Sequence, residues 1–151
     1  MRKSLTLKKP LMKLKKRQFE IDDAKMIIHK SVEPVDCNIT DDMLIALKNS
    51  GEAKTWFYEN EIVGCGGVVL YEKGKCEVWD ILNKDTIGKF KIELVKSARS
   101  FLDKMAKKYN ITYMRAVKRI DFNNKWLEHL GFTQTNELAM DGTAYVYARS
   151  F

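Results

Sequence analysis

One stretch, Cys76 to Met105, constrains the fold more than any other part of the chain. It reads as a short apolar strand, a polar turn over Asn83–Gly88 and a long amphipathic helix whose apolar residues recur every three or four positions. A helix that starts directly after a strand presents unpaired N–H groups and partial positive charge at its first turn. This order is typical of α/β proteins that bind an anionic ligand at such a turn.

Periodicity and turn residues predict the elements on either side of this stretch. In chain order we expect a strand over Leu14–Ile21, helices starting at Asp22 and at Thr40 (the second ending at Ser50-Gly51), strands over Lys54–Tyr58, Ile62–Tyr71 and Cys76–Leu82, the long helix capped by Asp85 or Thr86, a strand over Ile111–Val117, a short helix over Asp121–Leu130 ending at Gly131, and a hairpin around Asp141-Gly142. A strand reached through a helix returns parallel to an earlier one. The fold class is therefore α/β, with a mixed and mostly antiparallel sheet.

Positive charge is concentrated at the N-terminus. The net charge is +7, and the first 17 residues carry eight of the 27 basic residues and no acid. We divide the chain into a basic arm, 1–17, and one domain, 18–151. The arm either docks on nucleic acid or an acidic protein surface, or is a solvated tail beside the first strand. Its expected contact residues are Lys8, Lys9, Lys13, Lys15, Lys16 and Arg17. No aromatic residue lies in the arm to stack on bases, so sequence-specific reading is not predicted.

The remaining composition predicts no metal and no membrane span. Three cysteines, Cys37, Cys65 and Cys76, and two histidines show no zinc spacing. We expect reduced, mostly buried thiols in a cytosolic setting. No apolar run approaches the roughly 18 residues of a membrane helix, and the basic N-terminus lacks the apolar core of a secretory signal.

A family resemblance enters through Phe122–Phe132, which reads FNNKWLEHLGF. It resembles the closing signature of the GNAT superfamily of acetyl-CoA-dependent N-acetyltransferases, N-x-x-A-x-x-F-Y-x-K-x-G-F, and the order of elements over about 18–151 matches that fold. The resemblance implies a splayed parallel strand pair, a long central helix and three shorter ones. It also implies that the strand over Cys76–Leu82 pairs with the pantetheine arm of acetyl-CoA. The implied cofactor-binding residues are Leu82, Asn83, Lys84, Gly88, Lys89 and Asn123.

The same resemblance suggests Glu77 or Asp80 as the general base that deprotonates an acceptor amine. The alternative is that both are surface carboxylates paired with neighbouring lysines. Two positions depart from the family pattern. The family turn is Q/R-x-x-G-x-G/A, and here only Gly88 matches, while Asp85 and Thr86 add an acid and a β-branched side chain. Leu127 stands where the family has the tyrosine that protonates the thiolate, and leucine cannot donate a proton.

These departures resemble a narrower group, the small GNAT-like proteins of tailed bacteriophages, which include internal and head-associated virion proteins. The shared text is the Trp-containing strand Val78–Leu82 and the short helix ending in Trp126-Leu127 and Gly131-Phe132. The implied function is a non-catalytic virion component whose basic arm contacts phage structural proteins or DNA, located in the virion or the host cytoplasm, with self-association left open. Two alternatives remain: an active acetyl-CoA-dependent N-acetyltransferase acting on an amine, and a basic nucleic-acid-binding module.

Overall fold

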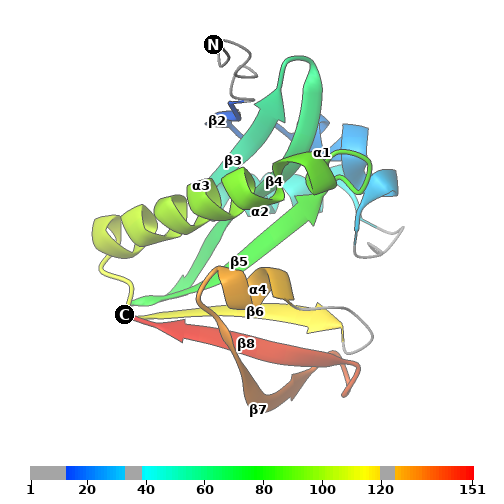
Figure 1. Ribbon diagram of the computed structural model, residues 1–151. Helices are drawn as coiled ribbons and strands as arrows, with labels where there is room; N and C mark the ends of the chain where they lie inside the picture. The colour runs from blue at the N-terminus through cyan, green and yellow to red at the C-terminus, as the bar shows by residue number, and fades with distance from the viewer. Residues whose placement is uncertain (1–12, 33–38, 120–124) are drawn as a thin grey trace, which may run out of the picture.

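The computed structural model describes residues 13–32, 39–119 and 125–151. Its core is a seven-stranded sheet in the order β2-β3-β4-β5-β6-β8-β7 (Figure 1). The strands are β2 Lys15–Gln18, β3 Gly51–Tyr58, β4 Glu61–Glu72, β5 Lys75–Leu82, β6 Tyr113–Arg119, β7 Thr133–Ala139 and β8 Ala144–Ser150. The helices are α1 Ile21–Ile27, the 3-10 turn η1 Ile28–Lys30, α2 Asp41–Asn49, α3 Ile87–Lys108 and α4 Lys125–His129.

The sheet is mixed, as the sequence predicts. Neighbouring strands are antiparallel except β5 and β6, which the α3 crossover makes parallel. That parallel pairing covers only three positions, Lys75–Glu77 against Tyr113–Arg115. Beyond them the two strands diverge and form the V seen in Figure 1. This confirms the splayed pair, and the gap inside the V becomes the centre of the functional question.

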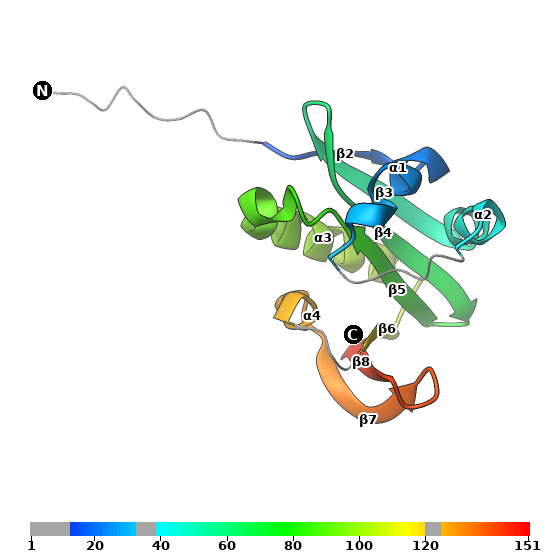
Figure 2. The ribbon, with the colours of Figure 1, turned by 90° about the vertical axis from the view of Figure 1, so that its right-hand side faces the viewer.

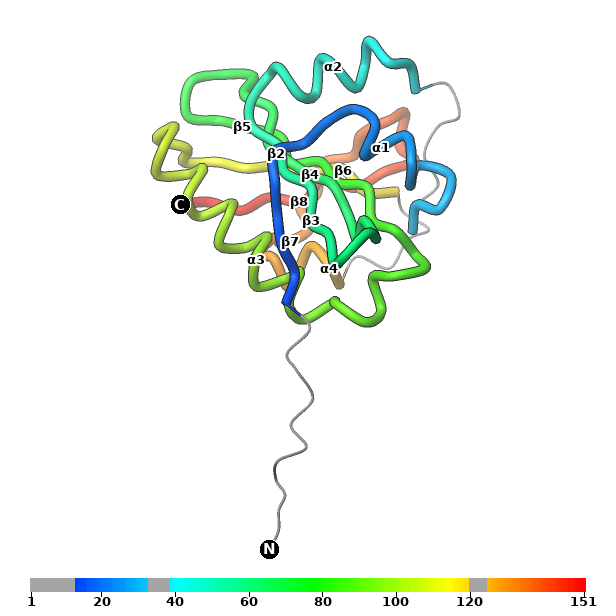
Figure 3. Tube along the Cα trace, turned by 90° about the horizontal axis from the view of Figure 1, so that it is seen from above, coloured from blue at the N-terminus to red at the C-terminus, as the bar shows by residue number. Residues whose placement is uncertain are grey.

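Helices cover both faces of the sheet (Figures 2 and 3). On one face, α3 and α4 pack over an apolar cluster that includes Val78, Leu94, Phe101 and Leu127. On the other face, α1 and α2 enclose a smaller cluster around Phe19, Leu44 and Ile81. The predicted apolar stripe of α3 is confirmed, because its buried residues are Phe90, Leu94, Ala98, Phe101, Leu102, Met105 and Ala106. Burying each large apolar side chain contributes roughly 1.5–3 kcal/mol.

The predicted signals at both ends of α2 and at Gly131 are confirmed. The Thr40 side chain accepts a hydrogen bond from the Met43 N–H and caps α2, and Gly131 ends α4 with φ of +95°. Helix α2 ends at Asn49 with Ser50 as its C-cap, where Ser50-Gly51 predicts its end. Gly51 is also the first residue of β3, and a Cβ there would lie 1.9 Å from the Val68 carbonyl oxygen. Gly51 therefore serves the close approach of β3 to β4.

Strand β2 crosses the predicted boundary between arm and domain at residue 17. Its residues Lys15–Gln18 pair antiparallel with β3, so the end of the basic segment is part of the sheet. Arg17, predicted as a partner contact, forms a two-pronged ion pair with Asp23 at 2.7 Å. Asp23 is buried and also accepts a hydrogen bond from Thr55 Oγ1 at 2.6 Å. This group fixes β2 to α1 and β3.

The Asp23 carboxylate is stabilised in its charged form. Burial acts to raise its pKa, but the hydrogen bonds from Arg17, Thr55 and the Glu20 N–H outweigh burial and hold the pKa below the ordinary value of 3.8. Because the folded-state pKa is the lower one, the stabilisation is fully present above the unfolded-state value. It is lost as the pH falls through the folded-state value.

We predict that Asp23→Asn lowers the free energy of unfolding at pH 7 by about 2 kcal/mol, because it removes the charge that Arg17 and Thr55 bind. Urea unfolding at several pH values measures this. The difference from the wild type should shrink below about pH 4. The matched control is Asp22→Asn at the exposed neighbour, which should cost less than about 1 kcal/mol. Equal costs for the two variants would contradict the role given to Asp23.

Candidate functional site

The gap between β5 and β6 is the candidate site. Side chains alternate along a strand, so Val78, Asp80 and Leu82 face α3, while Glu77 and Ile81 face α1 and α2. The core clusters agree, because Val78 packs with α3 and Ile81 packs with α1. The two predicted base residues therefore lie on opposite faces of the sheet.

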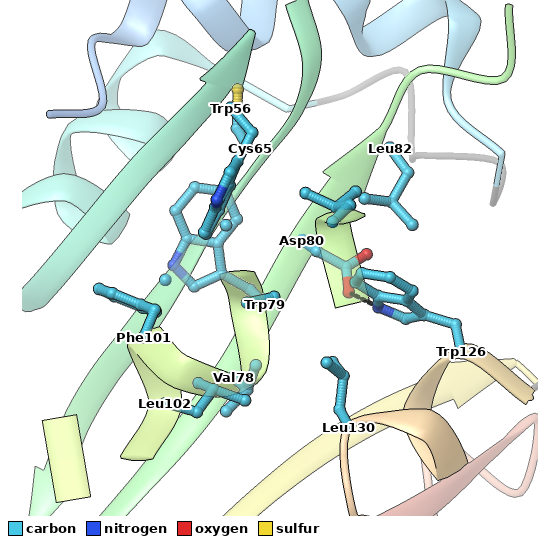
Figure 4. Close-up of a pocket in the computed structure, with 14 residues that line it drawn as sticks. Trp56, Cys65, Val78, Trp79, Asp80, Leu82, Phe101, Leu102, Trp126 and Leu130 are labelled. Atoms are coloured by element: carbon cyan, nitrogen blue, oxygen red, sulfur yellow. Dashed lines mark hydrogen bonds between the residues drawn. The ribbon is translucent and has the colours of Figure 1, made fainter. Parts of the chain in front are cut away.

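Asp80 bridges the gap. Its carboxylate accepts a hydrogen bond from Lys118 Nζ of β6 at 3.0 Å. It accepts another from Trp126 Nε1 of α4 at 2.9 Å (Figure 4). The Asp80 and Lys118 side chains are only 13% and 14% exposed. A poorly solvated pair of this kind is held by good geometry and extra hydrogen bonds, and loss of one partner leaves a buried charge. Asp80, Lys118 and Trp126, together the gap staple, thus join β5, β6 and α4.

Glu77 is also paired. It accepts a hydrogen bond from Arg115 Nε at 2.8 Å, at the last paired position of the parallel strands. The Arg115 guanidinium also lies over the Tyr71 ring, 5.3 Å from its centroid. Both carboxylates on β5 therefore already bind a cation from β6, which is the arrangement of the alternative reading. To act as a general base, either one would first have to release its partner.

Two hollows meet at β5. The first, between the sheet, α3 and α4, has a volume of about 30 Å³, which is roughly the share of one water molecule. The Trp126 indole lies beside it (Figure 4). The second, on the α1 and α2 face, has about 240 Å³ and is lined by Ser31, Ile39, Leu47, Glu77, Val78, Trp79, Asp80, Ile81, Val117 and Lys118. The staple therefore fills most of the space inside the V on the α3 face.

The turn before α3 is closed by its own hydrogen bonds. The buried Asn83 accepts N–H bonds on its main-chain carbonyl from Thr86 at 3.1 Å and Ile87 at 2.9 Å. Its side-chain Oδ1 accepts the Asp85 N–H at 3.0 Å, and its Nδ2 donates to the Ile62 carbonyl at 2.9 Å. The Lys84 N–H donates to the Lys30 carbonyl at 2.9 Å. Consecutive N–H groups from 84 to 87 are thus used inside the protein.

Thr86, one of the two predicted positions, is the N-cap residue of α3, but its side chain accepts no N–H of the first turn. Its hydroxyl instead faces the Ile62 carbonyl at 3.3 Å and the Asn83 carbonyl at 3.4 Å. Asp85 points toward solvent and forms a weak ion pair with Lys30 at 3.7 Å. The Asn83 carbonyl instead accepts the N–H groups of Thr86 and Ile87 at the start of the helix.

These residues do not fit acetyl-CoA as they stand. A pyrophosphate at a helix start needs N–H groups directed at it, and here 84–87 direct theirs to Lys30 and Asn83. The pantetheine arm needs an open gap, which the staple occupies. Of the other predicted residues, Leu82 lines the small hollow, and Lys84 and Lys89 are exposed beside Gly88. Asn123 lies outside the described residues.

The sequence analysis did not identify Lys118, and it named Trp126 only as part of the short helix shared with the phage proteins. A signal for Lys118 was available. Glu77 and Asp80 are three residues apart on β5, and Arg115 and Lys118 are three apart on β6. In parallel strands held in register, equal spacing of opposite charges predicts two cross-strand pairs.

The cysteines provide no nucleophile among the described residues. Cys65 and Cys76 are both buried, and burial raises the pKa of each thiol to about 12, so neither is a thiolate at neutral pH. Cys37 lies outside the described residues. Within 13–32, 39–119 and 125–151 no group of three or more His, Cys, Asp or Glu side chains is placed to hold a metal. None of the helices described is long and apolar enough to cross a membrane.

We predict that the staple contributes measurably to stability. Trp126→Phe removes the hydrogen bond to the charged Asp80, which should cost about 1.5–3 kcal/mol. The matched control is Trp79→Phe, because Trp79 Nε1 is buried without a hydrogen-bond partner among the described residues. That change removes no hydrogen bond and should cost about 1 kcal/mol less than Trp126→Phe. Urea unfolding of both variants measures the difference, and equal costs would remove the role of the Trp126–Asp80 bond.

Comparison with solved structures identifies the architecture. No sequence model of a protein family and no curated protein matches the chain. Ard1 from Thermoplasma volcanium superposes with a TM-score of 0.70 at 17% identity, over 91% of this chain and 97% of its own. An acetyltransferase from Streptococcus agalactiae gives 0.71 at 11% identity, over 91% and 98%. A Bacillus subtilis acetyltransferase in complex with CoA gives 0.66 at 15% identity, over 92% and 99%. The chain therefore has the fold of the GNAT acetyltransferases.

Proposed function

We propose that this chain is a non-catalytic protein with a GNAT fold that serves as a component of a tailed-phage particle. The observation that carries the non-catalytic part is the closed turn before α3. Asn83 collects the N–H groups of Asp85, Thr86 and Ile87, so the groups that would bind a pyrophosphate bind the protein instead.

The gap supports the same proposal. Asp80, a candidate base, holds Lys118 and Trp126 across the V. Leu127, at the position of the family tyrosine, is 1% exposed and packs in the main core. The candidate base Asp80 is thus held in a structural contact. Leu127 packs in the core at the position of the family's acid, and the turn at 83–87 binds its own N–H groups.

The virion assignment rests on the sequence resemblance to the small phage proteins and on the basic arm. Lys8, Lys9 and Lys13 would contact DNA or an acidic face of a phage structural protein. The protein would then be found in the virion or in the host cytoplasm. Lys15, Lys16 and Arg17 would contribute from β2, although Arg17 is bound to Asp23.

The alternative is an acetyl-CoA-dependent N-acetyltransferase acting on an amine. One observation favours it: the hollow of about 240 Å³ on the α1 and α2 face is bordered by both Glu77 and Asp80. An acceptor amine in that hollow would meet the Glu77 carboxylate once Arg115 moved away, whereas the Asp80 carboxylate is directed to Trp126 on the α3 face. Lys84 and Lys89, both exposed, would then have to bind the phosphates.

Calorimetry with acetyl-CoA separates the two functions. We expect no binding heat at about 1 mM cofactor, where a millimolar Kd corresponds to about −4 kcal/mol. The matched variant Asn83→Gln/Asp85→Ala/Thr86→Gly restores the family pattern at the turn and should bind more tightly than the wild type. Tight binding by the wild-type chain would refute the non-catalytic proposal. In that case Glu77→Gln and Asp80→Asn would show which carboxylate is the base.

The arm is tested in particles of the phage that encodes the chain. Lys8→Gln/Lys9→Gln/Lys13→Gln should reduce the amount of protein in purified particles about tenfold, since three exposed charge contacts at about 0.5 kcal/mol each sum to that ratio. The control Lys25→Gln/Lys30→Gln/Lys48→Gln removes the same charge from α1, η1 and α2 and should leave incorporation unchanged. Absence of the wild-type protein from particles would refute the virion assignment itself.

A further inference from the structure

The structure sorts charge by face, although the sequence beyond the arm is nearly neutral. Helix α3 carries seven basic residues and two acids, Glu93 and Asp103. Strand β2, KKRQ, carries three basic residues and no acid. On the opposite face, α1 and α2 carry four acids, and their only basic residues are Lys25 and Lys48. The excess charge of the described domain therefore lies on the side of α3 and β2.

Four lysines of α3 form one stripe. Lys89, Lys96, Lys104 and Lys107 are all exposed, and with Glu93 and Ser100 between them they follow each other at intervals of three and four residues. Residues at these intervals lie on one face of a helix. We call these four residues the lysine stripe. It runs along nearly the whole of α3.

The stripe lies on the flank of α3 that faces the β2 edge of the sheet. Next to the stripe, Ser97 accepts a hydrogen bond from Trp56 Nε1 of β3 at 2.7 Å. One turn beyond Lys104, Lys108 pairs with Glu52 at the start of β3. Residue Lys54 lies between Glu52 and Trp56 on the same face of β3. It is therefore opposite Lys104.

Lys16 completes the cluster from β2, where it pairs across from Trp56. Burial, followed by the charges of Lys104 and Lys54, lowers the pKa of Lys16. No ion pair joins Lys16, Lys54 or Lys104 to an acid in the part of the chain that the structure describes. Lys54 does act on the nearby Glu52 carboxylate, whose pKa it helps to lower, but Lys16, Lys54 and Lys104 still repel one another, and an anionic ligand would relieve that repulsion.

Leu14, near the C-terminal end of the arm, contacts the same surface. The Leu14 N–H donates to Glu93 Oε2 at 3.3 Å, and Glu93 sits within the stripe. Lys13, the next residue toward the N-terminus, is exposed. The first described residues, Lys13 and Leu14, therefore lie beside α3 next to the stripe.

We propose that the lysine stripe, together with Lys16 and Lys54, is a binding surface for the phosphate backbone of nucleic acid. The proposed function leaves the partner of the arm as either DNA or an acidic protein face. This inference rests on that proposed contact and specifies nucleic acid as the partner. It extends the contact from the arm to the folded domain.

Two properties favour a nucleic acid over an acidic protein. Protein interfaces are depleted in lysine and enriched in aromatic residues, methionine and arginine, whereas the four stripe positions are all lysine. The length also matches, because the 22 residues of α3 span about 33 Å, close to the roughly 34 Å of one duplex turn. Lysines contact phosphates as flexible point charges, so the surface would bind without reading sequence.

The test is fluorescence anisotropy of the full chain with a labelled duplex of mixed sequence about 20 base pairs long, at salt concentrations from roughly 50 to 200 mM. For Lys54→Gln/Lys96→Gln/Lys104→Gln we expect a salt slope smaller by about 2–3, since each phosphate contact contributes about 0.9, and binding at least about tenfold weaker at low salt. The control Lys25→Gln/Lys30→Gln/Lys48→Gln removes equal charge from the opposite face. It should change the affinity less than about twofold.

Equal effects of the two triple variants would overturn the proposal, because charge alone and not its position would then matter. Binding to polyglutamate but not to the duplex would also overturn it, in favour of an acidic protein partner. Thermal unfolding of the stripe variant should be unchanged or higher, since its substitutions relieve repulsion. The acetyl-CoA titration tests a separate claim. If the chain binds acetyl-CoA and the stripe variant still weakens duplex binding, only the non-catalytic function is refuted. If the chain binds neither acetyl-CoA nor the duplex, only this inference is refuted.

Discussion

Two parallel strands that separate after three pairs leave main-chain groups and a side-chain gap between them that something must fill. The rest of this structure depends on how that gap is filled. A ligand could fill it, and so could the protein. Here Lys118 of β6 and Trp126 of α4 both donate to Asp80 of β5, so the gap is closed by the chain itself. Trp126 and Leu130 of this segment line the hollow beside β5, where β5 and β6 have separated.

The turn before α3 is built by the same rule. A helix start has N–H groups that need acceptors, and Asn83 supplies both its carbonyl and its side chain. Its Nδ2 and the Thr86 hydroxyl both reach the Ile62 carbonyl of β4, which ties the helix start to the sheet. Only the Asp85 N–H depends on the Asn83 side chain. The N–H groups of Thr86 and Ile87 bind the main-chain carbonyl of residue 83, which a different side chain at 83 would leave in place.

Elements with local causes could be predicted from the sequence, and contacts between distant residues could not. The stripe of α3, the Thr40 cap and the αL stop at Gly131 each follow from neighbouring residues. The function of Asn83 depends on a carbonyl 21 residues away, and a turn read by itself does not include it. Arg17 was assigned to the basic arm because the sequence alone does not show its ion pair with Asp23 at the start of α1. The Asp80–Lys118 pair could have been inferred from the matched spacing of charges on two strands.

The closed gap between β5 and β6 and the lysines on α3 differ in how well their polar groups are paired. Around β5 nearly every buried polar group has a partner, with Trp79 Nε1 the exception among the described side chains. Where α3, β2 and β3 meet, Lys16, Lys54 and Lys104 repel one another. Stable packing needs no such cluster, and a protein that bound nothing there would be more stable without it. Under the proposed function, the working surface is therefore the outer face of α3, where these lysines gather at a cost in stability, and not the gap between β5 and β6.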